Sequence, residues 1–357
     1  MTITRLLSSF VTKSCKQQQC QIRALQTFSL RNTRGENNSH KITTADASRR
    51  IQQNYARRDY QKYPIVQEKE STDSPVISNN KTNSQNNESL IERIENSKTL
   101  NDLLLIFQQE HKTEFRPSHI STCWNKATDF IIGNEESETN PEFFLPLIEH
   151  TITIIKDCNE QEISNILWSN AVMNTTNPET IAPIFSHLSD QYNDKKITLA
   201  KENLYQIYQA YLWFTCEHGQ TSVLPNSLLK ECIMAFATQE NIASDHLKDV
   251  LVIFKSLGFK SKEDLLCPKT GYGIDAVITH EDSPQVAIVA DGPTHFVDYN
   301  PTGNTILKHR QLGNLGDRPI LVVPYWEWNQ ITDGQRNEIK RKEEYLQRAL
   351  DSLQDNE

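Results

Sequence analysis

The sequence contains no apolar run of about eighteen residues, the length that a helix needs to cross a membrane, so no membrane span is expected. Its seven cysteines are scattered and form no Cys-x-x-Cys pair, which argues against a disulfide framework or a cysteine-based zinc site. Positive charge is scarce, because 37 Lys and Arg stand against 46 Asp and Glu, a formal net charge of −9. Any binding to nucleic acid must therefore come from a local patch that touches phosphate.

The first 34 residues lack acidic side chains, and the segment after them is too polar to build a core. Residues 1–34 contain no Asp or Glu and interleave basic, Ser and Thr residues with apolar ones, which is typical of an organellar transit peptide. We predict a mitochondrial transit peptide and location in the matrix, with the plastid as the alternative. Residues 35–88 are rich in Asn, Gln, Ser, Thr and Lys. This composition predicts a disordered spacer, or a solvated helix around residues 45–59.

Residues 89–257 have helical periodicity. Helix starts are expected where Asn precedes Pro and Glu, with the Asn as N-cap, at residues 140–142 and 177–179. Trp124, Trp168 and Tyr208 recur at intervals of about 40 residues, and two helices per interval indicate an α-solenoid-like repeat. The alternative is an irregular helical domain. In both cases we expect these aromatic rings to pack between helices and not to stack on bases.

After Gly258 the pattern changes from a helical period to a period of two. We predict a strand hairpin, a helix, a buried strand and a closing helix, in this order: 273–280, 285–290, 306–315, 319–324 and 334–353. The order ββαβα indicates a small mixed α/β module at residues 258–357. The fold class is therefore α+β, with N-terminal α-solenoid-like helical repeats followed by this module.

Several motifs of the C-terminal module occur together in one order. AIVADGPTHFVDYNPTGNTILKHRQL is followed by PILVVPYWEW and then by EEYLQRAL. This arrangement resembles the RAP domain over roughly ninety residues, and EISNILWSNAVM resembles a helix of the octotricopeptide class. The resemblance implies an RNA-associated organellar protein acting in RNA processing, stability or translation, whose RAP module has an endonuclease-like fold.

Two carboxylates are expected to converge in the hairpin. Asp275 lies within an apolar strand, where an unpaired carboxylate is costly, so it needs a partner or a metal ion. Asp291 ends the next strand, and His295 follows the Gly-Pro turn. Asp275, Asp291 and His295 are therefore the candidate catalytic residues, and the two acids are the candidate ligands of a divalent metal. The alternatives are that Asp291 caps the turn through an Asx hydrogen bond and that His295 is a satisfied core residue.

The candidate RNA contacts are basic or aromatic residues of the same module. The basic ones can bind phosphate, and an exposed aromatic ring can stack on a base, although one tryptophan is expected in the core. These residues are Lys308, His309, Arg310, Tyr325, Trp326 and Trp328.

The module also resembles PD-(D/E)xK and very-short-patch nucleases, in which acids position Mg²⁺ and the attacking water. Here Val289 stands where RAP domains carry Glu, and no Lys follows at the expected spacing. We therefore predict a non-catalytic protein that binds single-stranded organellar RNA, without a cofactor, membrane contact or small-molecule substrate. The alternatives are a Mg²⁺-dependent endoribonuclease and, because the chain is acidic, a structural subunit of an assembly such as the mitochondrial ribosome.

Overall fold

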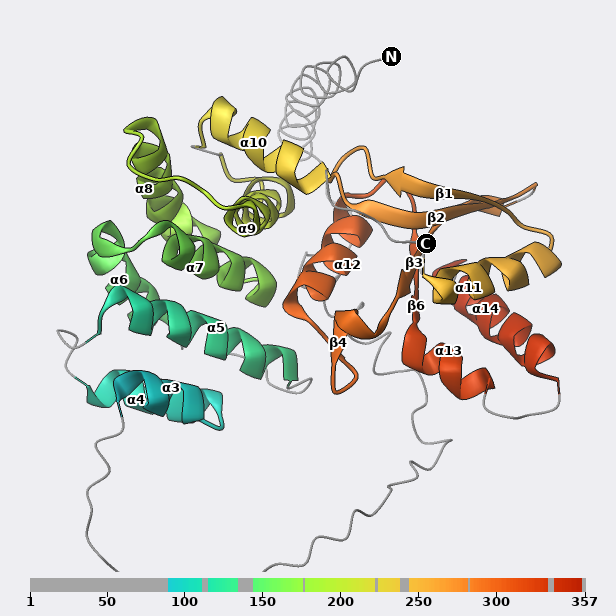
Figure 1. Ribbon diagram of the computed structural model, residues 1–357, viewed down its shortest axis with the longest axis horizontal. Helices are drawn as coiled ribbons and strands as arrows, with labels where there is room; N and C mark the ends of the chain where they lie inside the picture. The colour runs from blue at the N-terminus through green and yellow to red at the C-terminus, as the bar shows by residue number, and fades with distance from the viewer. Residues whose placement is uncertain are drawn as a thin grey trace, which may run out of the picture.

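The computed structural model describes residues 89–110, 115–133, 144–175, 177–221, 224–237, 244–281, 283–332 and 337–354. A helical region comes first in the chain and is followed by a small mixed sheet with its own helices (Figure 1), so the predicted α+β class is confirmed. None of the helices in these ranges is long and apolar enough to cross a membrane. The expected transit peptide, the spacer and the helix start at 140–142 lie outside the described residues.

The helical region consists of short helices that pack around one core. They are α3 (Leu90–Asn96), α4 (Leu100–Gln109), α5 (Pro117–Gly133), α6 (Leu145–Ile154), α7 (Glu160–Met173), α8 (Ala182–Asn193), α9 (Lys201–Tyr211) and α10 (Asn226–Ala237). Three of these helices begin with a capping box, in which the N-cap side chain and the side chain three residues later satisfy backbone N–H groups. The N-caps are Ser89, Thr99 and Asn159.

Helices α5, α7 and α9 lie side by side in chain order (Figure 1). The Asn165 amide donates to the Ser121 hydroxyl at 3.3 Å, across 44 positions of sequence. Trp124 is fully buried and its indole N–H donates to Thr151 at 3.0 Å, which confirms the expected packing role of this ring. Asn177 is at an N-cap position with Pro178 after it, as expected, but the helix that begins there is a short 3₁₀ helix, Pro178–Ile181, before α8, and the Asn177 side chain makes no cap bond.

The sheet has four strands in the order β1-β2-β3-β6. The strands are β1 (Lys260–Leu266), β2 (Gly273–His280), β3 (Ser283–Asp291) and β6 (Ile320–Pro324). The predicted hairpin is confirmed, since β2 and β3 are antiparallel, and β6 pairs parallel to β3. The carboxyl ends of β3 and β6 therefore lie next to each other, with Asp291 opposite Pro324.

The two faces of the sheet pack against different parts of the molecule, because successive strand residues point to opposite sides. Ala287 and Val289 join the core of the helical region. Ile288 and Ala290 pack instead with helices after the helical region. These are α11 (Asp245–Ser256) and α14 (Glu338–Gln354), beside α13 (Tyr325–Thr332), and they lie together at one side of the sheet (Figure 1).

Helix α12 (Gly303–Leu315) joins the helical region to the sheet (Figure 1). Its Gly303 lies against the Trp168 ring so closely that a Cβ atom would sit 2.6 Å from Cη2 of that ring. The Trp168 indole N–H donates to Asn304 and to Gln209, both at 3.1 Å. Glycine is therefore required here by a close approach between two helices.

A buried ion pair closes the same junction. Arg310 of α12 donates from Nε to Glu217 at 2.9 Å and from its terminal nitrogens to the carbonyls of Ala171 and Val172. The Arg310 and Glu217 side chains are 5% and 0% exposed. A buried ion pair needs such added hydrogen bonds to offset the desolvation of its charges. The junction is therefore a specific polar interface as well as an apolar one.

Candidate functional site

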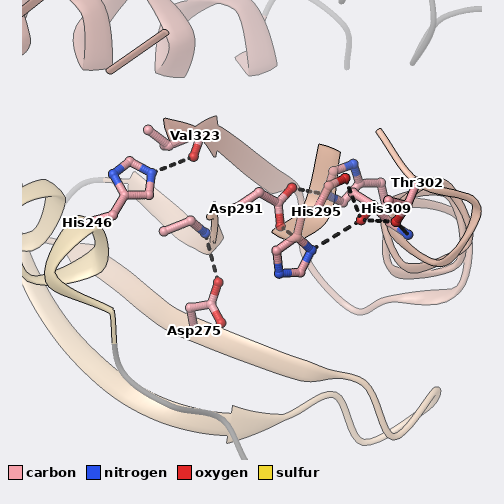
Figure 2. Close-up of polar contacts among 9 residues, drawn as sticks. His246, Asp275, Asp291, His295, Thr302, His309 and Val323 are labelled. Atoms are coloured by element: carbon pink, nitrogen blue, oxygen red, sulfur yellow. Dashed lines mark hydrogen bonds and ion pairs between the residues drawn. The ribbon is translucent and has the colours of Figure 1, made fainter. Parts of the chain in front are cut away.

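Asp291 is a buried carboxylate at the carboxyl end of β3. It is 1% exposed, and its Oδ2 lies 2.6 Å from Nε2 of His309 on α12, while Oδ1 lies 3.4 Å from Nδ1 of His295 (Figure 2). Burial by itself raises the pKa of Asp291, but the neighbouring His309, helped by His295, lowers it below the ordinary value of a carboxyl. Asp291 is therefore ionised at neutral pH, and its charge is held between two imidazoles.

His295 lies at the entrance of this cluster and is held by the start of α12. Its Nδ1 lies 3.1 Å from the Thr305 hydroxyl, and its carbonyl accepts the Thr302 N–H at 2.8 Å. Burial lowers the pKa of His295, although Asp291 opposes this effect, so the imidazole is neutral at neutral pH. The side chain is still 37% exposed and can be reached by a ligand.

Asp275 of β2 is half-buried on the same sheet face as Asp291. Its Oδ2 accepts the Ala290 N–H at 2.8 Å (Figure 2). Burial raises the pKa of Asp275, and the charge of Lys308 on α12 opposes that rise. Lys308, itself half-buried, is the lysine whose charge acts on both acids.

The groups around the two acids are poorly suited to holding Mg²⁺. One Asp275 oxygen is bonded to a backbone N–H, Asp291 is paired with His309, and the residue between them on this face, Val289, is fully buried and apolar. In the described part of the chain, no group of three or more His, Cys, Asp or Glu residues is placed to hold a metal ion. Mg²⁺ requires several hard oxygen ligands in near-octahedral order, and this donor set does not fit it.

The structure brings together Asp275, Asp291, His295, Lys308 and His309. We call this group the open end, because it lies where the parallel strands β3 and β6 end. In open α/β sheets, ligands bind outside the carboxyl ends of the strands. The open end is therefore the place on the module where a ligand is expected.

Three of the predicted RNA contacts are buried. His309 is 2% exposed and is paired with Asp291, and the other two lie away from the open end. Arg310 is buried in the junction with Glu217, because it lies about 100° around the helix from His309. Trp328 is 2% exposed, its indole donates to Asp249 at 2.7 Å, and Lys342 lies 4.9 Å above its ring. Both side chains are therefore occupied within the protein and offer no surface to RNA in this conformation.

Tyr325 and Trp326 begin α13 and lie beside a short hairpin that was not predicted from the sequence. The hairpin joins β4 (Phe296–Val297) to β5 (Asn300–Pro301). Its turn, Asp298-Tyr299, contains no Gly, so the usual Asn-Gly or Asp-Gly hairpin signal is absent. Alternating polar and apolar residues in FVDYNP were the only local sign of it.

The fold defines this chain as an α+β protein in which a helical region is joined to a small mixed-sheet module with a His/Asp cluster at its open end. The family model of the RAP domain matches residues 288–349, from β3 into α14. The chain therefore carries a RAP domain, as the motifs of its C-terminal module indicated.

A curated relative carries the same domain name. The chain is 26% identical over 199 residues to a "RAP domain-containing protein, chloroplastic" of Oryza sativa subsp. japonica. The match covers 53% of this chain and 29% of the rice protein. The chain thus matches less than a third of the length of that relative.

Proposed function

We propose that this is an organellar RNA-binding protein that acts in RNA processing, stability or translation without catalysing a reaction. The RAP domain carries this proposal, because it suggests association with RNA. The open end supports it: Lys308 offers a cation to phosphate and His295 offers an exposed imidazole. Since the whole chain is acidic, binding must depend on such local contacts.

The test is the affinity of the full chain for short single-stranded RNA, measured by fluorescence anisotropy at several salt concentrations. We expect a dissociation constant of roughly micromolar or tighter that weakens as salt rises. Lys308→Glu should weaken binding. It should also reduce, by about one, the magnitude of the slope of log affinity against log salt concentration.

The matched control is Lys340→Glu, which makes the same charge change on α14, where the side chain is 74% exposed. Lys340 lies on the other side of the sheet, so this variant should bind like the wild type. Absence of RNA binding by the wild type would refute the function. Equal losses in both variants would refute the open end as the phosphate contact.

We also propose that the helical region contributes to binding as a solenoid-like array. The side-by-side packing of α5, α7 and α9 supports this, as does the hydrogen bond across 44 positions between Asn165 and Ser121. Such an array would hold an RNA segment or a protein partner along the row of helices.

For the location we propose the mitochondrial matrix, with the plastid as the alternative. Residues 1–34 have the composition of a transit peptide, and the rice relative is named chloroplastic, which favours an organelle. A fluorescent protein fused to residues 1–34 should enter one of these organelles, and a cytosolic fusion would contradict the proposal.

An endoribonuclease is the second candidate, because Asp275, Asp291 and His295 do converge. The unsuitable Mg²⁺ donor set argues against it. Incubation of organellar RNA with the protein, with Mg²⁺ or Mn²⁺ added, separates the two functions. Cleavage by the wild type that is lost in Asp275→Ala would establish the nuclease, and cleavage no greater than that of the variant would exclude it.

A structural subunit of a mitochondrial ribonucleoprotein assembly is the third candidate, favoured by the net charge of −9. A protein that docks on other proteins needs no strongly basic face. Co-sedimentation with ribosomal particles after nuclease treatment would favour this candidate, and release from the particles would favour the RNA binder.

A further inference from the structure

The β4–β5 hairpin, residues 296–301, has an unusual turn. Asp298 and Tyr299 both have positive φ, at 48° and 70°, as a two-residue type I′ turn requires, and Gly, Asn or Asp usually fill such positions. A tyrosine in the left-handed region is uncommon, and strained backbone gathers at functional sites. Here the turn holds the Tyr299 side chain at the tip, 64% exposed.

The hairpin forms an aromatic surface with the start of α13. The Tyr299 and Trp326 rings are 5.6 Å apart and nearly perpendicular, at 72°. Behind them, the rings of Phe296 and Tyr325 are 5.8 Å apart. Val297, on the first strand of the hairpin, is 65% exposed. We call the surface of these five side chains the aromatic hairpin site.

This site borders the open end. The hairpin begins directly after His295, and α13 begins directly after Pro324, which is paired with Asp291. Lys308 directly precedes His309 on α12, whose Nε2 lies 2.6 Å from Asp291, and its charge lowers the pKa of Asp291 and of His295. Aromatic rings and a nearby cation are the two parts of a site for single-stranded nucleic acid.

The size and composition of the site favour a base over a protein partner. Its most exposed side chains, Val297 and Tyr299, are separated by Asp298 and followed by Asn300, both exposed polar residues. Each partner of a stable protein interface contributes roughly 20–30 residues, many more than the five side chains of this interrupted patch. One or two unpaired bases need only a ring face.

We propose that the aromatic hairpin site stacks an unpaired base of single-stranded RNA, with the adjoining phosphate facing Lys308. This rests on the proposed RNA-binding function and adds the hairpin to it. Tyr299 is the principal contact, because its ring is the most exposed of the four.

The experiment compares two probes: a single-stranded RNA oligomer and an oligomer of the same length whose central residues are abasic. Wild-type protein should bind the complete RNA more tightly. Tyr299→Ala should weaken that binding by roughly 5- to 100-fold, as expected for the loss of a base–aromatic stack, and should leave binding to the abasic oligomer unchanged.

Tyr299→Phe keeps the ring and should bind like the wild type. Ile339→Ala removes a side chain that is 63% exposed on α14 and is the matched control. Thermal melting checks that each variant folds. If the wild type binds RNA and Tyr299→Ala binds it equally well, the aromatic hairpin site is refuted while the RNA-binding function stands. If the wild type binds no RNA, both are refuted.

Discussion

The two sides of helix α12 use the same kinds of polar residue in different ways. Toward the helical region, Arg310 is fully enclosed, with Glu217 and backbone carbonyls around it. Toward the end of the sheet, Lys308 and the neighbouring His295 remain partly exposed and face acids that already have other partners. The first side is the buried junction with the helical region, and the second is a surface that a ligand can reach.

The difference shows that a basic residue type alone does not mark a binding contact. Lys308 and Arg310 are only two positions apart, but about 200° of helix rotation separates them, so they face different sides. The role of each basic residue depends on whether other groups of the protein enclose its side chain. We therefore expect substitutions at the junction to change the stability of the fold, and substitutions at the open end to change RNA binding.

The largest effect is expected for Arg310→Ala. Removing one partner of a buried ion pair leaves Glu217 unpaired, which costs about 3–5 kcal/mol of unfolding free energy. Denaturant titration measures it. Arg318→Ala is the control, because Arg318 pairs with its neighbour Asp317 near the surface, and such pairs contribute about 0–1 kcal/mol. Equal losses of unfolding free energy in the two variants would contradict the buried ion pair at the junction.

A smaller effect on the same side is expected for Gly303→Ala. The new Cβ would overlap the Trp168 ring, and overpacking of this kind costs about 1–3 kcal/mol. The control is Gly292→Ala, since Gly292 has negative φ and nothing lies within 4 Å of its would-be Cβ. If both variants had the melting temperature of the wild type, the close approach between α7 and α12 would be wrong.

At the open end, the two acids should respond to pH in opposite directions. The pKa of Asp291 is lowered on folding, so it stabilises the fold above its unfolded value of about 3.9, and this stability is lost as pH falls through the folded pKa. The pKa of Asp275 is raised, so its ionisation opposes folding at neutral pH, and this opposition disappears as pH falls through the folded value.

Asp291→Asn should therefore lower the melting temperature at pH 7, and Asp275→Asn should raise it while its amide oxygen still accepts the Ala290 N–H. The Asp275 difference should shrink as the pH falls through its raised folded pKa. The Asp291 difference should shrink only as the pH falls from about 3.9 toward its lowered folded pKa. Melting curves across pH measure this. The same sign of change in both variants would contradict the different environments assigned to the two acids.

Much of the fold could be predicted from the sequence, because its elements have clear periods. The strands β2, β3 and β6 and the final helix fall close to the predicted ranges. The edge strand β1 was missed because its sequence, KSKEDLL, is charged and mostly exposed, as suits the edge of a sheet. Helix α13 was not predicted: its sequence, YWEWNQIT, falls between the strand predicted at 319–324 and the helix predicted at 334–353.

The candidate site was predicted in part. The proximity of Asp275, Asp291 and His295 followed from the hairpin, since paired strands bring distant residues together. The pairing of Asp291 with His309, and of Arg310 with Glu217, depends on where α12 packs. No local pattern states that placement, because it is fixed by contacts between segments far apart in the sequence.

The central claim is that the open end and the aromatic hairpin site bind RNA and that the junction does not. Photo-crosslinking tests it most directly. Single-stranded RNA containing 4-thiouridine is crosslinked to the full chain, and mass spectrometry locates the modified residues. The account predicts crosslinks in residues 295–301 and at Tyr325 or Trp326, and none at Arg310 or Trp328. Crosslinks confined to the helical region would contradict it.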